Sequence, residues 1–384
     1  MKIVYIIPSL EIKGGAERIV IEKANYLSEH YGYDVSIITQ CHHNNAPIAY
    51  PLSEKIHHIN LGIPYYNQYK YSYPKRLWLK WRINKRLRKE TTDAVLQIDP
   101  DILITLPLFK PHIAYAIPCR AKKIIEVHEP LEYHLYSGFL NKSWISKRLK
   151  KHYFETVLKN ADVFVSLTDD DRILLKKAHR VEVIPNFSSM KISQYSTCTA
   201  KRVIAVGRFS HVKGYERLLK IWGVVNAQYA DWHLDIFGDG SLRTELAHYA
   251  DDHHIKNVTI HEATHDISQE YANSSICTVT SYYEGFSLVI LEAMMHGVPC
   301  VAFDCPTGPR SIIKNNQCGY LIENGNEDLF AEKLCNLIDS KELRTLFSNA
   351  AIERAKTFNL DIIMGQWKSL FESLSGNMDN HQHN

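Results

Sequence analysis

The chain has 384 residues, of which 45% are hydrophobic and 23% are charged, and its formal net charge at pH 7 is +3. This length exceeds the size at which a single hydrophobic core keeps growing, so we expect two domains. The small net charge gives no argument for a nucleic-acid partner, and none is expected.

Strands and helices alternate along the first half of the chain, which is the pattern of a parallel sheet with crossover helices. The apolar runs predict strands at about 2–8, 34–39, 101–106, 123–128, 161–167 and 181–185. Helical periodicity predicts helices near 15–30, 76–98 and 144–159. The pattern stops at Ile184-Pro185-Asn186-Phe187, where a polar stretch without periodicity begins. We therefore place the boundary of the first domain at residue 187.

A second series of strands follows, and it predicts another Rossmann-like domain over residues 188–358. Its strands are expected at 202–206, 233–237, 257–261, 276–280 and 299–303. The turn after the second of these strands contains Gly238 and Asp239, and Asp239 is expected to cap a helix that starts at Ser241. An amphipathic segment from Leu360 to Leu374, which carries Trp367, predicts a last helix.

The segment 281–299 is the most informative part of the sequence. An apolar strand pattern precedes it, and the residues from Phe286 to about His296 follow a helical pattern. Glu284 is therefore expected in a strand-to-helix turn, where open α/β sheets bind ligands and a helix start offers N–H groups to an anion. Glu292 is expected two turns along the same side. Alone, such a pair more often marks two solvated helix positions.

This segment resembles the donor site of the family 4 glycosyltransferases. The family signature is Glu, seven residues, Glu, with Gly-Phe after the first Glu and Glu-Ala-Met/Ala-x-x-Gly-x-Pro at the second, and every position is filled here. Residues 206–214 match the family's Gly-Arg-x-x-x-x-Lys-Gly element, and residues 8–18 match its first glycine-rich turn. The resemblance implies a retaining enzyme of GT-B fold, with two Rossmann-like domains whose parallel sheets face each other across a cleft. It also implies that the last helix, about 359–376, packs back on the acceptor-side domain 1–187, while 188–358 binds the nucleotide sugar.

The resemblance assigns roles to individual residues. Arg208 and Lys213 supply the cations that hold a nucleotide diphosphate, so no metal or other cofactor is expected. Glu284 receives hydroxyls of the donor sugar, and Glu292 receives the ribose hydroxyls. His128, at the end of a predicted strand, touches the hydroxymethyl side of the sugar. The expected catalytic residues are Glu284, His128, Arg208 and Lys213.

The remaining donor contacts come from backbone groups. Glycine lets the backbone approach a phosphate closely, and the turn before the predicted helix offers free N–H groups. The expected donor-binding residues are Gly14, Gly15, Arg208, Lys213, Gly238, Glu284, Gly285, Phe286, Ser287, Leu288 and Glu292.

The segment from Lys70 to Lys89 carries nine basic residues, and its helical pattern places Trp78 and Trp81 on the basic side. Such a face is often merely solvated. Exposed tryptophan among lysine and arginine is nevertheless what a membrane-surface patch requires, because the rings lie at headgroup level while the cations meet anionic lipid. We therefore expect a peripheral anionic membrane surface as a partner.

The eight cysteines include no Cys-x-x-Cys pair and no zinc-type spacing with histidine. The first eight residues are too short for a signal sequence, and no apolar run reaches the roughly 18 residues that span a bilayer. A cytoplasmic protein, peripheral on the inner face of the membrane, is expected.

The sequence thus predicts transfer of a hexose or N-acetylhexosamine from a nucleotide-diphospho-sugar, UDP-linked by expectation. The acceptor is expected to be a surface polysaccharide or lipid-linked glycan, joined by an α-glycosidic bond. Two alternatives stay open: a GT-B nucleotide-sugar epimerase and a non-catalytic GT-B subunit that binds glycan.

Overall fold

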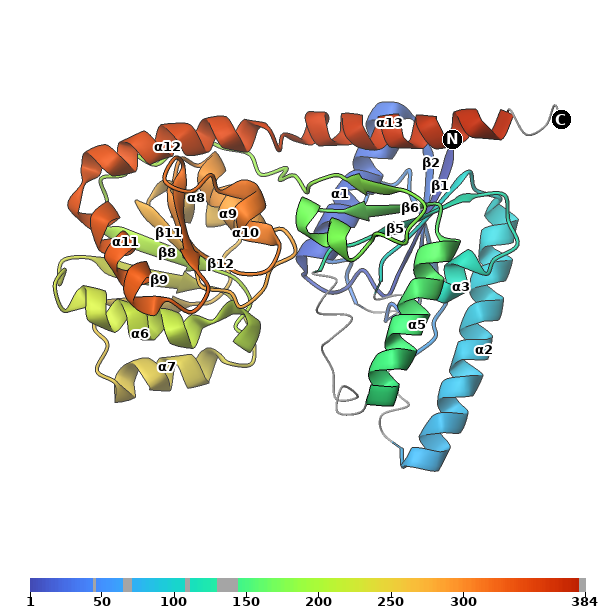
Figure 1. Cartoon of the computed structure of the whole chain (residues 1–384), viewed down its shortest axis with the longest axis horizontal. Helices are drawn as coiled ribbons and strands as arrows, with labels where there is room; N and C mark the ends of the chain where they lie inside the picture. Colours follow the sequence, from blue (N-terminus) through green and yellow to red (C-terminus); the bar gives the residue numbers. More distant parts are fainter. Residues whose placement is uncertain (44–45, 65–70, 108–110, 130–143, 380–384) are drawn as a thin grey trace. The chain divides into compact units, whose positions relative to one another are not determined.

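The computed structural model describes residues 1–43, 46–64, 71–107, 111–129 and 144–379. It divides the chain into two compact units, each built on one fully parallel sheet (Figure 1). The first unit comprises Met1–Leu167, Asp171–Ile184 and Ile363–Asn384, and the second comprises Thr168–Asp170 and Pro185–Ile362.

The first unit contains a seven-stranded sheet with the order β3-β2-β1-β4-β5-β6-β7. Its strands are β1 (Lys2–Ile7), β2 (Asp34–Thr39), β3 (His57–Asn60), β4 (Ile102–Thr105), β5 (Lys122–Glu126), β6 (Val163–Ser166) and β7 (Val181–Val183). Its helical segments are α1 (Gly15–Tyr31), α2 (Tyr73–Ile98), α3 (Pro111–Tyr115), α5 (Trp144–Asn160), most of the 3-10 helix η3 (Asp169–Ile173) and most of α13 (Leu360–Asp379).

The second unit contains a six-stranded sheet with the order β10-β9-β8-β11-β12-β13. Its strands are β8 (Arg202–Val206), β9 (His233–Phe237), β10 (Val258–His261), β11 (Ile276–Val279), β12 (Cys300–Asp304) and β13 (Gly319–Glu323). Its helical segments are η4 (His211–Lys213), α6 (Tyr215–Asn226), α7 (Arg243–Asp252), α8 (Ile267–Ala272), α9 (Leu288–Met295), α10 (Gly308–Ile312), α11 (Glu327–Asp339) and α12 (Lys341–Lys356).

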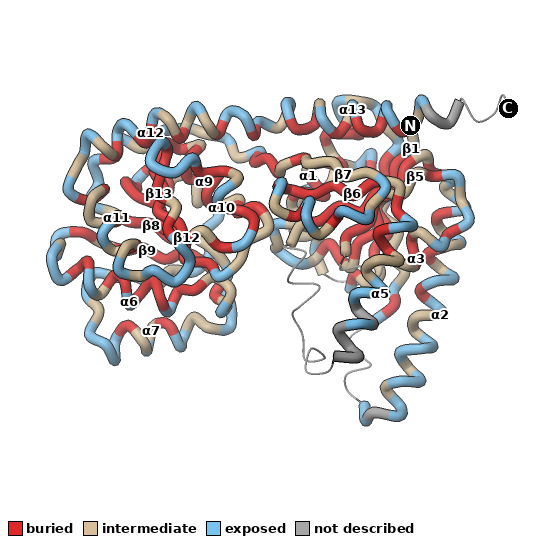
Figure 2. Tube along the Cα trace, in the orientation of Figure 1, coloured by how far each residue is buried: buried red, intermediate tan, exposed pale blue. Residues whose placement is uncertain are grey.

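The central strands of both sheets are buried, as the red segments of Figure 2 show. In the second unit, Trp222 of α6, Phe303 of β12 and Phe330 of α11 belong to one apolar cluster. In the first unit, Leu87 and Val95 of α2 pack into a cluster with the sheet residues Val4 and Leu103. Each sheet is therefore held rigidly at its centre, and the loops at its carboxyl edge are positioned by that core.

Most predicted strands are present, but β3 and β13 were missed. β3 is His57-His58-Ile59-Asn60, so an edge strand with one apolar residue leaves almost no apolar pattern. β13 begins at Gly319, which has a φ of +156°. A Cβ atom on Gly319 would lie 2.6 Å from the carbonyl oxygen of Cys300, so this position accepts only glycine. Both strands pair through the backbone at a sheet edge, where side-chain patterning is weakest.

Candidate active site

The loops that follow β8 and β11 meet at the carboxyl edge of the second sheet, because these two strands are direct neighbours. Lys213 lies on η4 after β8, and Glu284 lies on the loop after β11. Lys213 Nζ is 2.7 Å from Glu284 Oε1, and Ser281 Oγ donates a hydrogen bond of 2.6 Å to the same oxygen. The expected cation and the expected carboxylate are thus brought together.

Gly214 explains how the two loops approach so closely. Its φ of +65° lies in the left-handed region, and a Cβ there would be 2.1 Å from the carbonyl oxygen of Thr280. Thr280 Oγ1 donates hydrogen bonds of 3.2 Å to the Lys213 carbonyl and 3.0 Å to the Gly214 carbonyl. The residue after Lys213 must therefore be glycine for the lysine to reach Glu284.

The backbone of Glu284 is held by the loop after β12. Glu284 forms an isolated parallel bridge with Thr307, and the Gly308 N–H donates to the Glu284 carbonyl at 3.2 Å. Thr307 Oγ1 also donates to that carbonyl. A Cβ on Gly308 would be 3.0 Å from Glu284 Cβ, so glycine is what lets this loop pack against the site. Glu284 is thus fixed through its backbone as well as through Lys213.

The expected geometry of the two carboxylates is wrong in one respect. Ser287 has a φ of 51°, which a continuing right-handed helix cannot adopt, and α9 begins only at Leu288. Glu284 therefore lies outside the helix and Glu292 within it, so the separation of the two is not set by helical spacing. Glu292 is 5% exposed, which places its carboxylate in the interior of the unit.

The N–H groups expected at the helix start are distributed differently from the prediction. Gly285 and Phe286 precede the cap residue Ser287, whose carbonyl accepts hydrogen bonds from the N–H groups of Ile290 and Leu291. The Phe286 ring is buried, so only the backbone of this residue is available to a ligand. Within the described part of the chain, Ser287 Oγ is buried without a hydrogen-bond partner. An unpaired hydroxyl beside a helix start is suited to a polar ligand.

Arg208 differs from Lys213 in that it is exposed and, among the described residues, has no ion pair. It follows β8 directly, on the same loop as Lys213. Lys213 is therefore already paired with a carboxylate, whereas Arg208 is available to bind an anion.

Gly238 has a structural reason to be glycine. A Cβ at this position would lie 1.9 Å from the carbonyl oxygen of Gly207, so the loops after β8 and β9 can touch only without a side chain. The expected cap at Asp239 is wrong, because α7 begins at Arg243 and Asp239 Oδ1 instead accepts from the Ala263 N–H at 3.4 Å. The residues at the Asp239 turn hold loops together rather than starting a helix.

The other expected residues lie in the first unit. Gly14 and Gly15 start α1 after β1, and Gly14 has an ordinary φ of −114°. His128 follows β5, and its side chain is 4% exposed. Nε2 of His128 lies 3.0 Å from Oε1 of Glu126, whose other oxygen pairs with the ammonium of Lys23.

Lys23 and Glu126 were not among the expected site residues, although the sequence contains a signal for both. Glu126 interrupts the apolar strand pattern Lys123-Ile-Ile-Glu-Val. Lys23 lies on the apolar side of α1, four residues after Ile19 and four before Leu27, both of which are buried. A single charged residue inside each of two buried patterns indicates a buried ion pair, since an isolated buried charge is too costly.

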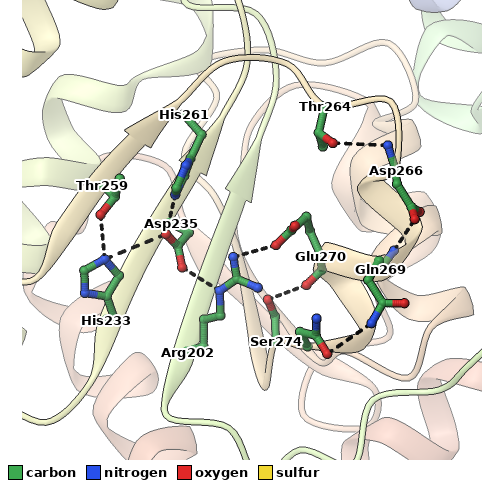
Figure 3. A network of polar contacts seen from close by, with 11 residues as sticks. Arg202, His233, Asp235, Thr259, His261, Thr264, Asp266, Gln269, Glu270 and Ser274 are labelled. Carbon is green, nitrogen blue, oxygen red and sulfur yellow. Dashed lines mark hydrogen bonds and ion pairs between the residues drawn. The ribbon is translucent and has the colours of Figure 1, made fainter.

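A second polar network occupies the sheet of the second unit away from these loops (Figure 3). Asp235 of β9 accepts hydrogen bonds of 2.5 Å from Arg202 Nε and from His261 Nε2. Arg202 also donates to Glu270 of α8 at 2.6 Å. Because Arg202 is the first residue of β8, this network starts at the amino edge of the sheet and has a structural role.

Two family models match the chain. One, described as Glycosyltransferase Family 4, matches residues 13–188, and the other, Glycosyl transferases group 1, matches residues 194–354. Together they cover most of the chain and both of its units.

Relatives match over nearly the whole length. An uncharacterized glycosyltransferase of Haemophilus influenzae is 28% identical over 374 residues, which cover 96% of this chain and 99% of that protein. The amylovoran biosynthesis glycosyltransferase AmsD of Erwinia amylovora is 28% identical over 386 residues, with the same coverage. Among solved structures, a mutant of S. aureus TarM in complex with fondaparinux, alpha-GlcNAc-glycerol and UDP has a TM-score of 0.76 at 16% identity. That match covers 96% of this chain and 99% of TarM, and it shows the fold. The chain therefore belongs to the family 4 glycosyltransferases, an enzyme family, and has the GT-B fold.

Proposed function

We propose that this glycosyltransferase moves a hexose or N-acetylhexosamine from a UDP-sugar to a surface polysaccharide or lipid-linked glycan, with retention and therefore an α-linkage. The observation that carries the proposal is the pairing of Lys213 with Glu284, together with the exposed cation Arg208 on the loop that carries Lys213. Two cations within one loop match the charge of a diphosphate, and the carboxylate matches the hydroxyls of a sugar.

The relatives support the finer parts of this proposal. AmsD is named an amylovoran biosynthesis glycosyltransferase, another relative is named a lipopolysaccharide 1,6-galactosyltransferase, and the TarM complex contains alpha-GlcNAc-glycerol and UDP. We carry the polysaccharide acceptor, the uridine base and the α-linkage from these proteins to this chain. Glu284, Arg208, Lys213 and His128 are proposed to act on the donor sugar and its diphosphate.

The test is a panel of nucleotide sugars, first by thermal shift and then by the fate of the labelled sugar. Stabilisation by UDP-sugars, with label transferred to a lipid-linked glycan and an α-configured product by NMR, is the expected result. Label that stays on the nucleotide with an inverted centre would identify the epimerase alternative, and binding of glycan without turnover would identify the non-catalytic one. A β-configured product overturns retention alone.

We also propose that transfer needs no divalent ion. Arg208 and Lys213 both follow β8, and they would supply two positive charges to the diphosphate. Among the described residues, no group of His, Cys, Asp or Glu side chains is arranged to hold a metal.

A peripheral membrane surface is proposed as a further partner. The rings of Trp78 and Trp81 on α2 are 53% and 61% exposed. The Arg82 guanidinium lies 5.4 Å from the Trp78 ring, and Lys85 Nζ lies 5.4 Å from the Trp81 ring. This combination of apolar rings and cations matches an anionic headgroup layer. Lys70, where the basic run begins, lies outside the described residues. No described helix is long and apolar enough to cross a bilayer.

A further inference from the structure

The first unit contains a buried charge cluster that the family motifs do not include. Lys23 projects from α1, Glu126 ends β5, and His128 follows two residues later. The Lys23 ammonium pairs with Oε2 of Glu126, and His128 Nε2 lies 3.0 Å from Oε1 of the same carboxylate. The side chains of Lys23 and Glu126 are each 1% exposed. Glu126 is therefore shared between a lysine and a histidine in the interior of the unit.

Aromatic rings cover the rest of the lysine. Lys23 Nζ lies 3.7 Å from the centroid of the Trp367 ring on α13 and 5.5 Å from that of Tyr5 on β1. The face of an aromatic ring attracts a cation, most strongly where water is excluded. Burial, with the nearby charge of Glu126, raises the pKa of Tyr5 well above its usual value, so the phenol stays neutral and adds no charge. The titratable groups that face Glu126 from the surrounding elements are then Lys23 and His128.

The carboxylate determines which nitrogen of His128 carries hydrogen. Burial alone would raise the pKa of Glu126, but the charge of Lys23 above all, together with the contact to His128, lowers it to about 2. Glu126 is therefore an anion at neutral pH. A ring nitrogen 3.0 Å from an anionic oxygen must carry a proton, because two lone pairs at that distance would repel. Nε2 of His128 thus bears the hydrogen.

The other ring nitrogen is left open. In a neutral ring with hydrogen on Nε2, Nδ1 carries a lone pair and accepts hydrogen bonds. Within the described part of the chain, both ring nitrogens of His128 are buried and neither makes a well-directed hydrogen bond. Nε2 nevertheless lies 3.0 Å from the Glu126 carboxylate, whereas no polar contact of this kind is recorded for Nδ1. A buried acceptor without a partner requires a ligand or water to satisfy it.

We propose that Lys23 and Glu126 are positioning residues, which hold His128 as the neutral Nε2–H tautomer and present its Nδ1 to a hydroxyl of the sugar substrate. The inference rests on the proposed function, because it takes His128 as a sugar-contacting residue. Lys23 acts by balancing the negative charge of Glu126. With both Lys23 and Glu126 charged, the cluster is neutral only when His128 is neutral, and a buried site favours zero net charge.

The first experiment follows the pH dependence of kcat/KM. Lys23→Met removes the ammonium, so the negative charge of Glu126 then favours the protonated form of His128. The acidic limb of the kcat/KM profile is therefore expected to move to higher pH by about one unit or more. In Lys23→Met/Glu126→Gln no anion remains beside His128, and the acidic limb moves below that of the wild type. If Lys23→Met does not fold, this uncharged double variant carries the test. Lys177→Met, which breaks an exposed pair with Glu155 in the same unit, is the control and leaves the limb in place. A limb that stays fixed in both Lys23 variants overturns the proposal.

The second experiment does not depend on sugar transfer. Long-range 1H–15N spectra of histidine-labelled protein show which ring nitrogen bears hydrogen, and His128→Ala identifies the His128 signals. We expect the neutral Nε2–H tautomer in the wild type at pH 7 and a protonated ring in Lys23→Met. An Nδ1–H tautomer in the wild type, or a ring that does not respond to Lys23→Met, overturns the positioning role even if transfer occurs as proposed. Normal transfer by His128→Ala overturns the sugar contact, even if the tautomer is as expected.

Discussion

The ammonium of Lys213 and the carboxylate of Glu284 satisfy each other across 71 sequence positions, at 2.7 Å. Within the proposed function, these two groups serve different parts of one donor, the diphosphate and the sugar. A diphosphate that binds Lys213 weakens its hold on Glu284, which then has an oxygen free for a sugar hydroxyl. The pair therefore couples recognition of the diphosphate to recognition of the sugar. Substitution of Lys213 or of Glu284 should weaken the binding of both parts of the donor.

Substitution of Glu284 or Arg208, both proposed to bind the donor, should strongly reduce turnover without unfolding the protein. Glu284→Ala and Arg208→Ala are each expected to lower kcat by about 100- to 1,000-fold, because a fixed charge at the transition state is lost. Arg243→Ala, which removes a partly exposed arginine of the same unit that pairs with Glu262, is the control and should transfer sugar normally. The measurement is the rate of sugar transfer, with the melting temperature recorded for each variant. Near wild-type rates in Glu284→Ala or Arg208→Ala would refute the site.

Transfer is expected to continue in EDTA at an unchanged rate. Arg208 and Lys213 provide the positive charge that a divalent ion provides in other transferases, so chelation removes nothing from the site. The rate is measured before and after exhaustive chelation. Complete loss of transfer, restored by Mg²⁺ or Mn²⁺, would show that an ion is required.

The basic side of α2 should bind anionic vesicles at low salt and release them as ionic strength rises. Each basic residue near a charged surface contributes about 1 kcal/mol, and Trp78 and Trp81 add an apolar anchor. Charge reversal at Arg82, Lys85 and Lys89 is expected to abolish sedimentation with these vesicles. It should spare transfer to a soluble acceptor analogue, because the donor loops belong to the other unit.

Charge reversal at Lys256 and Lys341, two exposed lysines of the second unit, is the matched control. Those variants should sediment as the wild type does. If the wild-type protein does not sediment with anionic vesicles at any salt concentration, the basic side of α2 is merely exposed to solvent and the membrane proposal is wrong.

The Asp235 network makes the stability of the second unit depend on pH. Burial alone would raise the pKa of Asp235, but hydrogen bonds from Arg202 and His261 outweigh it and hold that pKa below its usual value. The stabilisation is therefore complete above the pKa of the unfolded carboxyl, about 3.9, and is lost as pH falls through the lower pKa of the folded state.

Asp235→Asn should lower the free energy of unfolding by about 1 to 3 kcal/mol at pH 7, because hydrogen bonds to a charged group are weakened. The difference from the wild type should shrink as the pH falls below about 4, where the carboxyl of the unfolded chain becomes protonated, and should vanish below the lower pKa of the folded state. Urea unfolding at several pH values measures both effects. Asp251→Asn, an exposed substitution on α7, should change little. A difference that is constant with pH would contradict the charge-based account.

Two glycine substitutions should have opposite effects. Gly238→Ala places a methyl group 1.9 Å from the Gly207 carbonyl, so the loops after β8 and β9 must separate at a cost of about 1 to 3 kcal/mol. Gly365→Ala lies within α13 and meets no atom within 4 Å, so it should stabilise the helix by up to about 1 kcal/mol. Thermal unfolding measures both. Equal effects would mean that the packing of Gly238 is not what requires glycine.

The sequence predicted the positions of most strands because apolar runs report burial directly. It also placed Lys213 and Glu284 in one site, since both follow adjacent apolar strands and belong to recognisable motifs. It failed at Ser287, where a left-handed residue ends the loop and starts the helix late. A positive φ at a serine leaves no compositional signal, because nothing but the surrounding loop packing enforces it.

The pairing of Lys23 with Glu126 was not predicted because the two residues lie 103 positions apart. Each residue is visible as a charge within an apolar pattern, but neither segment of sequence indicates that α1 and β5 are in contact. Only the order of strands in the sheet, which brings β5 near α1, joins them. Long-range pairing of this kind is a property of topology rather than of either segment.

The ring of Trp367 shields a lysine that belongs to the first helix of the chain. The ribosome completes the second unit before it adds most of α13, so the first unit still lacks this helix when the second unit has been made. Until then the Lys23 ammonium lacks its aromatic cover, and a chain that stops short of Trp367 exposes the buried charge pair to water. Closure of the first unit therefore waits for the synthesis of α13, which would leave chains terminated before Trp367 open to proteases.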